Sequence, residues 1–277
     1  FTAAAPVSPS LASPDELRAS VLVDQINPAQ GFTINASFGR IGKRLVEDGV
    51  IDFERFKEVY DRAGIPLTDR QLQIFEEGLD ENITITRENA YFLLNFFWAF
   101  GLANQNPILD EGEITKFGLG QIGSFASTGG WTIATKPVME IYSRSDIVTL
   151  TEAQQARVLE VAGNVYRPCC GNSTAFPDCN HGMALLGVLE LMAANDASVD
   201  DMYRAAKYFN AFWFPREYFD LALYFKAKDG LDFAQIDAKT IVGSDYSSGF
   251  GWTDKKQWLA RNNFIEQAPQ SGGGCGV

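Results

Sequence analysis

Histidine and sulfur-containing residues are scarce in this chain of 277 residues, which has four cysteines, four methionines and a single histidine. Because the one histidine lies within a cysteine-rich stretch, no spare imidazole is left for a Ser-His-Asp triad. The chain also lacks CxxC, CxxCH and GKS/GKT sequences and any strand–GxGxxG–helix arrangement. The sequence therefore lacks the usual motifs of thioredoxin-type redox sites, c-type haem attachment sites and phosphate-binding loops. No catalytic residue is identified.

Positive charge and long apolar runs are also limited. The 23 Lys and Arg against 35 Asp and Glu give a net charge of −12, which argues against a nucleic-acid partner or an anionic membrane surface. The longest apolar run, residues 90–102, is shorter than the roughly 20 residues that a spanning helix needs. We therefore expect a soluble protein without a transmembrane segment, in which residues 90–102 form a core helix.

The first residues have a distinct composition. Residues 1–13 are rich in Ala, Pro and Ser, and the chain does not begin with Met. Such a segment is typical of a chain from which a leader has been removed. We expect residues 1–13 to be flexible and the protein to be exported, to the periplasm or the extracellular space.

Helix signals dominate the rest of the chain. Ser13, Pro14 and Glu16 combine a capping box with a proline at the first helical position and predict a helix over 14–26. Near the other end of the chain, Thr253 is a suitable N-cap for a last helix over 254–266. The other helical patterns cover 151–165, 181–194, 198–214 and 216–228. Since no stretch alternates long enough for a large sheet, the sequence predicts a mainly α, multi-helix globular protein.

A weak internal repeat lies in the first half. Residues 45–49 and 74–78 each end in glycine and are followed by short extended pieces, 50–53 and 83–86. The repeat predicts two helix–strand–helix units within the helical region 14–103, with their short strands paired. This is the small two-stranded element of the predicted fold.

The remaining chain divides by composition into three parts. Residues 104–150 are rich in glycine and predict a long packed loop. Residues 151–270 form a helical region that carries the cysteines and the histidine, and residues 271–277 form a Gly-rich tail that contains Cys275.

The stretch from residue 166 to residue 183 carries the strongest chemical signal. It contains Cys169, Cys170, Cys179 and His181, which are three of the four cysteines and the only histidine. Thiolate and imidazole are the ligands of Cu(I), Zn(II) and iron–sulfur clusters, and a turn-rich loop can bring several of them onto one ion. The cluster predicts a soft transition-metal site.

The position of Cys179 supports this prediction. Asp178, Cys179 or Asn180 is expected to open the helix that follows, which places the Cys179 sulfur beside unpaired N–H groups at the positive end of the helix dipole. This environment favours the thiolate. A thiolate serves both metal ligation and thiol exchange, so this argument does not choose between them.

Cys275 is a further candidate ligand. Residues 271–274 of the tail offer no apolar area to bury, so we expect Cys275 to anchor it, through a disulfide or a metal bond. With Cys275, five soft donors are available, which suffice for a four-ligand site or for two ions. Copper is the preferred metal, with zinc or an iron–sulfur cluster as alternatives.

Two alternatives to a metal site stay open. Two disulfides between the CysCys pair and the other two cysteines would make the protein a stapled binding or scaffold protein with a protein partner. In a thiol–disulfide oxidoreductase, the Cys169–Cys170 pair would instead undergo thiol–disulfide exchange with Cys275 in the tail. Counting the free thiols of the denatured protein separates these hypotheses.

Overall fold

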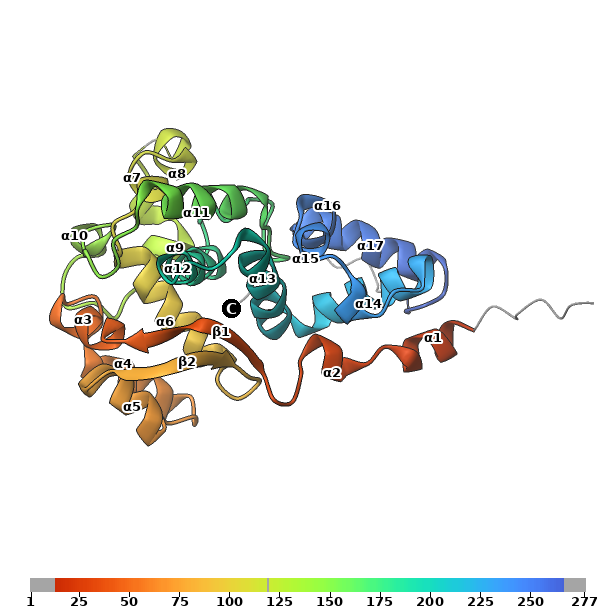
Figure 1. The fold of residues 1–277 in the computed structure, drawn as a ribbon, viewed down its shortest axis with the longest axis horizontal. Coiled ribbons are helices and arrows are strands. Elements are labelled where there is room, and N and C mark those ends of the chain that lie inside the picture. Colours follow the sequence, from red (N-terminus) through yellow and green to blue (C-terminus); the bar gives the residue numbers. More distant parts are fainter. Residues whose placement is uncertain (1–12, 119, 267–277) are drawn as a thin grey trace, which may run out of the picture.

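An apolar helix, α6 (Ala90–Ala103), lies against α12 (Asn180–Ala194) at the centre of the molecule in the computed structural model, which describes residues 13–118 and 120–266 (Figure 1). The two backbones nearly touch: a Cβ at Gly101 would lie 2.2 Å from the Met183 carbonyl oxygen, and one at Gly187 would lie 2.7 Å from that of Phe97. Both positions therefore require glycine. The predicted core helix is confirmed, because most of α6 is buried.

The only sheet among the described residues pairs β1 (Phe32–Gly39) antiparallel with β2 (Leu79–Ile85). In β1, alternate residues Ile34, Ala36 and Phe38 are buried, as expected for a strand with one face on the core. Three helices fill the connection between the strands: α3 (Ile41–Glu47), α4 (Phe53–Arg62) and α5 (Asp69–Glu76). The predicted mainly α fold with a small two-stranded element is confirmed.

The strand expected at residues 50–53 is wrong. Val50 and Ile51 are fully buried, but their N–H groups both donate to the Leu45 carbonyl and close the end of α3. Asp52 then caps α4 through the Arg55 N–H. The apolar pair is a buried connection between helices, and the strand that pairs with β2 lies earlier in the chain.

The helix expected over 14–26 is divided. The capping box and proline begin α1 (Pro14–Ser20) as predicted, but Val21 and Leu22 are extended before α2 (Val23–Ile26) starts. Both short helices contact α14 (Pro215–Asp229), so the bend lets the chain follow that helix. Apart from Ser13, the predicted flexible segment 1–13 lies outside the described residues, as does the predicted tail 271–277.

The Gly-rich stretch 104–150 contains short helical pieces joined by loops. They are α7 (Pro107–Asp110), α8 (Glu113–Phe117), η1 (Ile122–Ser124), α9 (Ala126–Gly129) and α10 (Val138–Ile141). This stretch packs against the core, since Trp131 is buried and its indole N–H donates to the Val50 carbonyl at 2.8 Å.

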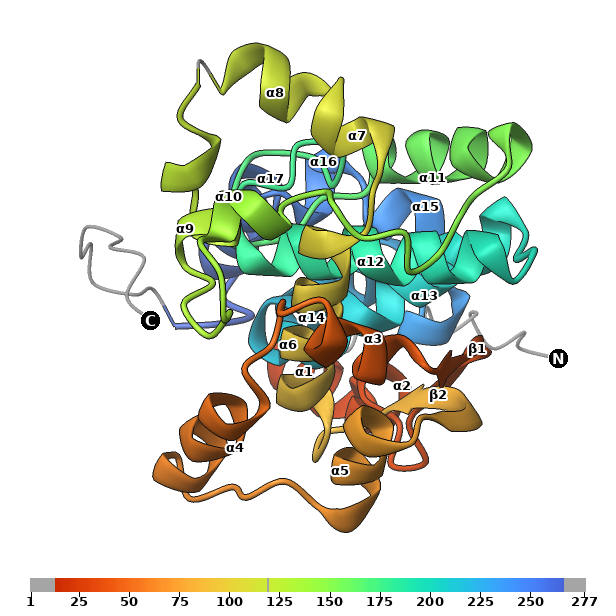
Figure 2. The same ribbon diagram turned by 90° about the vertical axis from the view of Figure 1, so that its left-hand side faces the viewer.

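The second half is built of longer helices. Helix α12 runs between α11 (Glu152–Asn164) and α13 (Val199–Trp213), as Figure 2 shows. The elements after α14 are η2 (Phe233–Gln235), α15 (Ala238–Ile241), α16 (Ser244–Ser247) and α17 (Gly249–Arg261). Among the described residues, no helix is long and apolar enough to cross a membrane.

The last helix begins earlier than predicted. Ser248, not Thr253, is its N-cap, and the Thr253 hydroxyl instead donates to the Gly249 carbonyl within the helix. Two glycines obscure this start in the sequence. Gly251 is required there because a Cβ would lie 2.4 Å from the Ser244 carbonyl oxygen of α16.

Candidate metal centre

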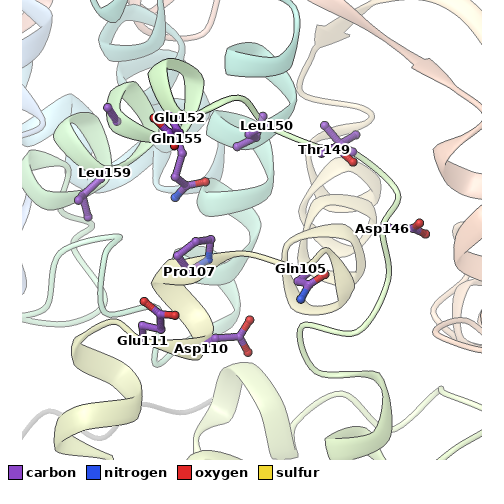
Figure 3. A pocket seen from close by; sticks show the side chains of 12 residues that line it. Gln105, Pro107, Asp110, Glu111, Asp146, Thr149, Leu150, Glu152, Gln155 and Leu159 are labelled. Carbon is purple, nitrogen blue, oxygen red and sulfur yellow. The ribbon is translucent and has the colours of Figure 1, made fainter.

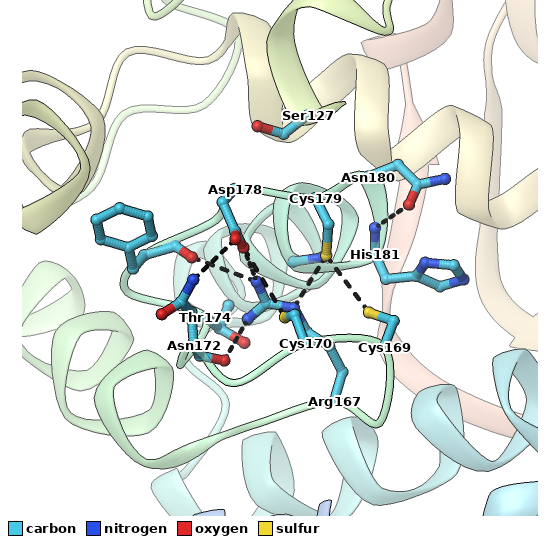
Figure 4. A network of polar contacts seen from close by, with 12 residues as sticks. Ser127, Arg167, Cys169, Cys170, Asn172, Thr174, Asp178, Cys179, Asn180 and His181 are labelled. Atoms are coloured by element: carbon cyan, nitrogen blue, oxygen red, sulfur yellow. Dashed lines mark hydrogen bonds and ion pairs between the residues drawn. The ribbon is translucent and has the colours of Figure 1, made fainter. Parts of the chain in front are cut away.

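Three cysteines meet where the loop of residues 166–179, which we call the cysteine loop, enters α12 (Figure 4). Cys179 is the N-cap of α12, and its Sγ accepts a hydrogen bond from the Gly182 N–H at 3.4 Å. The sequence-based placement of a cysteine sulfur beside the unpaired N–H groups of this helix is therefore confirmed. Cys169 and Cys170 come from the other end of the loop.

Hydrogen bonds to the backbone of the cysteine loop hold it to several neighbouring elements. Tyr166 and Ser173 form an isolated antiparallel bridge within it. The Gly249 N–H at the start of α17 donates to the Cys170 carbonyl at 2.7 Å, and the Ser127 N–H of α9 donates to the Asp178 carbonyl at 3.1 Å. Further bonds reach α11 and α13. The loop is thus positioned by the fold on several sides.

The three sulfur atoms are close enough to share one ion. The Sγ atoms of Cys169 and Cys179 lie 3.5 Å apart, and all three sulfurs lie within 4.8 Å of one another. A metal–sulfur distance of about 2.3 Å corresponds to sulfur–sulfur separations of about 3.8–4.0 Å. Small side-chain rotations would therefore convert this triangle into a coordination sphere.

A buried guanidinium lies beside the sulfurs. The Arg167 side chain is 0% exposed. Its Nε donates to Cys179 Sγ at 3.2 Å, and its terminal nitrogens donate to Asp178 Oδ1 at 2.8 Å and to the carbonyls of Asn172 and Phe176. Asn172 also donates to the second oxygen of Asp178 at 2.8 Å. Because a buried charge is costly without such partners, Arg167 determines how the loop is folded around it.

Glycine at the first turn of α12 makes room for this guanidinium. A Cβ at Gly182 would lie 2.4 Å from the Arg167 terminal nitrogen and 2.5 Å from its central carbon. The helix backbone and the guanidinium are therefore in direct contact. Gly182 contributes both an N–H donor to the Cys179 sulfur and the space for the positive charge.

The electrostatics of the cluster favour one thiolate. A hydrogen bond from the Cys169 thiol, the neighbouring Cys170 thiol and the Arg167 guanidinium together hold the pKa of Cys179 well below its ordinary value of 9.0. The interactions of Cys169 with Cys170 and Cys179, together with burial, raise the pKa of Cys169. Burial alone would lower the pKa of Arg167, but the charges of the cysteine sulfurs raise it, so the guanidinium stays charged.

His181 lies next to this cluster, but its ring nitrogens do not belong to the group of mutually close ligand atoms. The imidazole packs on Phe214, with ring centroids 4.4 Å apart, and edge-on to Trp213 at 6.0 Å. It points away from the sulfurs in Figure 4. Burial lowers the pKa of His181 to about 4, so the ring is neutral at physiological pH.

Cys275, the fifth candidate ligand, lies outside the described residues. The structure thus brings Cys169, Cys170 and Cys179 together and keeps the His181 ring on an aromatic surface nearby.

Sequence reasoning missed the contribution of Arg167. The available signal was that Arg167 is the only Lys or Arg between residues 166 and 183, directly before Pro168 and the CysCys pair. A lone positive charge next to clustered thiols indicates a counter-charge. Its burial and its contact with Gly182 depend on the folded loop.

A separate cavity of about 620 Å³ lies between α7 and α11 (Figure 3). Its lining includes Pro107 and Leu159 together with the acidic residues Asp110, Glu111 and Glu152. None of the described cysteines lines it. The candidate metal centre therefore does not coincide with this cavity.

Comparisons with known proteins add no relative: no family model matches the chain, and neither the curated proteins nor the solved structures give a match. Function is therefore inferred from the geometry of the site.

Proposed function

We propose that this protein binds a soft transition-metal ion through Cys169, Cys170 and Cys179. The observation that carries the proposal is the group of three sulfurs within 4.8 Å of one another at the N-terminus of α12. Thiolate-rich sets of donors select soft ions, above all Cu(I). Copper is accordingly the preferred ion, and zinc or an iron–sulfur cluster is the alternative.

The number of donors favours copper over zinc. Structural zinc sites almost always use four ligands, whereas the described residues bring three sulfurs together. Zinc would need a fourth donor, for which His181 and Cys275 are the candidates. His181 would have to leave the Phe214 ring on which it packs.

Cys275 has enough chain to reach the cysteine loop. Helix α17 starts beside Cys170 and extends away from it over 13 residues, or about 20 Å. A chain of about nine residues between residues 266 and 275 spans up to roughly 30 Å when extended. Cys275 is therefore retained as an additional ligand in the proposal.

Metal titration of the reduced, full-length protein without oxygen tests the proposal. We expect about one equivalent of Cu(I) to bind, or two if Cys275 and His181 support a second ion, and X-ray absorption at the metal edge to show sulfur neighbours at about 2.3 Å. The same spectrum distinguishes zinc and an iron–sulfur cluster. Binding of less than about a tenth of an equivalent, together with two disulfides in the purified protein, would overturn the proposal in favour of a stapled scaffold.

The metal contents of Cys→Ser variants show how much each cysteine contributes to metal binding. Cys179→Ser should lose more metal than Cys275→Ser, because Cys179 is held by the Gly182 N–H and Arg167, whereas Cys275 must be brought in at a cost in chain entropy. Equal metal contents in the two variants would contradict this ranking. Export, which was expected from the composition of residues 1–13, stays a prediction.

A further inference from the structure

The distance between two of the sulfurs points to a second chemistry at the same site. Cys169 Sγ and Cys179 Sγ are 3.5 Å apart, and a disulfide bond is about 2.05 Å long. The alternative partners are less suitable. Neighbouring Cα atoms are about 3.8 Å apart, which strains a Cys169–Cys170 bond, and the Cys170 thiol is directed to Asp178 Oδ1 at 3.8 Å.

We propose that Cys169 and Cys179 form a disulfide when a small hydroperoxide oxidises the ion-free protein, and that this bond prevents metal binding. The inference rests on the proposed metal-binding function, whose state it regulates. It also selects one pairing from those that the sequence left open.

The hydrogen bonds around the cluster indicate which cysteine reacts first with the hydroperoxide and which one then closes the disulfide. Cys179 Sγ faces two donors, the Gly182 N–H at 3.4 Å and Arg167 Nε at 3.2 Å, which stabilise negative charge on that sulfur. Cys179 is therefore the attacking thiolate. Cys169, whose sulfur lies 3.5 Å from that of Cys179, is the second thiol. All three loop cysteines are partly buried, so a small oxidant is the suitable reagent for them.

Hydrogen peroxide oxidises the two cysteines in two steps. The Cys179 thiolate attacks one peroxide oxygen, the O–O bond breaks, and hydroxide leaves, which gives a sulfenic acid on Cys179. The Cys169 sulfur then attacks the Cys179 sulfur, the S–O bond breaks, and the second oxygen leaves as hydroxide. The two thiol protons convert the two hydroxides to water. The cysteines lose two electrons, and the peroxide gains them.

Disulfide formation removes two of the three sulfur ligands at once and leaves Cys170. Changes to groups that only contact a ligand cost roughly 10–100-fold in metal affinity, so the loss of two direct ligands should cost more. The oxidised protein should therefore release its ion.

Peptide mapping of the oxidised protein tests the pairing. Metal-free, reduced protein is treated with hydrogen peroxide, alkylated under denaturing conditions and cleaved before Asp178, which separates Cys169 and Cys170 from Cys179. We expect the four thiols to fall to two, with one disulfide joining the two peptides. The same disulfide should form in Cys170→Ser and in Cys275→Ser.

The Cys169→Ser variant isolates the first step. It should form no disulfide between the two peptides and should accumulate a sulfenic acid on Cys179 that dimedone traps. A disulfide between Cys170 and Cys179 formed as fast in this variant as in the wild type would overturn the inference. So would a wild-type disulfide to Cys275 in place of the Cys169–Cys179 bond, or four thiols after peroxide treatment.

Copper titration separates this inference from the proposed function. If the reduced protein binds Cu(I) and the oxidised protein binds it with less than a hundredth of that affinity, both are supported. Equal binding by the two forms would refute the regulation and leave the metal site in place. Absence of binding by the reduced protein would refute the proposed function, whereas the peptide map would still decide the pairing.

Discussion

The two ends of α12 lie in chemically different surroundings, although one helix carries both. Near its N-terminus, the buried guanidinium of Arg167 donates to a sulfur, a carboxylate and two carbonyls. Toward its C-terminus, Glu190 is also fully buried, but it accepts one hydrogen bond, from Asn104 at 3.0 Å. Its Oε1 has no partner among the described residues.

This difference shows how one rigid helix supports a charged site and an uncharged one. Arg167 keeps its charge because acceptors surround it. Burial raises the pKa of Glu190 well above its ordinary value of 4.5, so this carboxyl group favours the neutral form. Between the two ends, α12 packs closely against α6 at Gly187 and Gly101.

The largest effect on stability is expected from disrupting the contact between the middle of α12 and α6. Gly101→Leu would place side-chain atoms where the Met183 carbonyl and the Gly187 N–H now lie, which should destabilise the fold by about 3 kcal/mol. Denaturant unfolding measures this loss. Gly163→Leu on α11 is the matched control, because nothing lies within 4 Å of its Cβ position. Equal stability of the two variants would show that the helices do not need this close approach.

A large effect confined to the N-terminal end is expected for Arg167→Met. Removing one partner of a buried charge pair typically costs about 3–5 kcal/mol, and here it takes one of the hydrogen-bond donors away from both Asp178 and the Cys179 sulfur. Circular dichroism should show that the total helix content is kept, while metal affinity falls. Arg62→Met, at a side chain that is 77% exposed, is the control. Unchanged stability of Arg167→Met would refute the role of this guanidinium.

Glu190→Gln is expected to have a smaller effect on stability, and this variant should be stabilised, not destabilised, at alkaline pH. Because the folded-state pKa of Glu190 is raised, the stability that its neutral form allows is fully present below about pH 4.5 and is lost as the pH rises through the folded-state pKa. Glutamine cannot ionise, so the variant should lack this part of the pH dependence and be the more stable protein at alkaline pH. Unfolding free energies from pH 4 to 9 measure the difference, and parallel profiles would contradict it.

The smallest effect is expected for Asn172→Ala. This change removes one hydrogen bond to the Asp178 carboxylate, a contact worth about 1.5 kcal/mol, and should weaken metal binding only moderately. Asn195→Ala is the matched control at the other end of α12, where the amide donates to the Leu191 carbonyl at 2.8 Å. It should leave the metal affinity unchanged. Equal effects of the two variants on metal binding would remove the distinction between the ends.

Local chemistry explains which elements could be predicted. The capping box at Ser13 and the apolar run of α6 are decided by neighbours in the sequence, and both were predicted. The cap at Cys179 was one of three neighbouring positions that the sequence offered. The strand expected at 50–53 was wrong because two buried apolar residues look alike in a strand and in a connection between helices. Glycines concealed the start of α17, since their close packing cannot be seen in a local pattern.

Some features of the candidate site could likewise be predicted from the local sequence, and others could not. The sequence by itself determined that Cys169, Cys170, Cys179 and His181 are close along the chain and that a helix begins within residues 178–180, because caps and turns depend on short-range contacts. Only the tertiary structure decided that three sulfurs form a triangle, that Arg167 is buried beside them and that His181 packs on Phe214. Those outcomes depend on contacts with α9, α13 and α17, which lie far away in the sequence, and on the need of a buried charge for partners on every side.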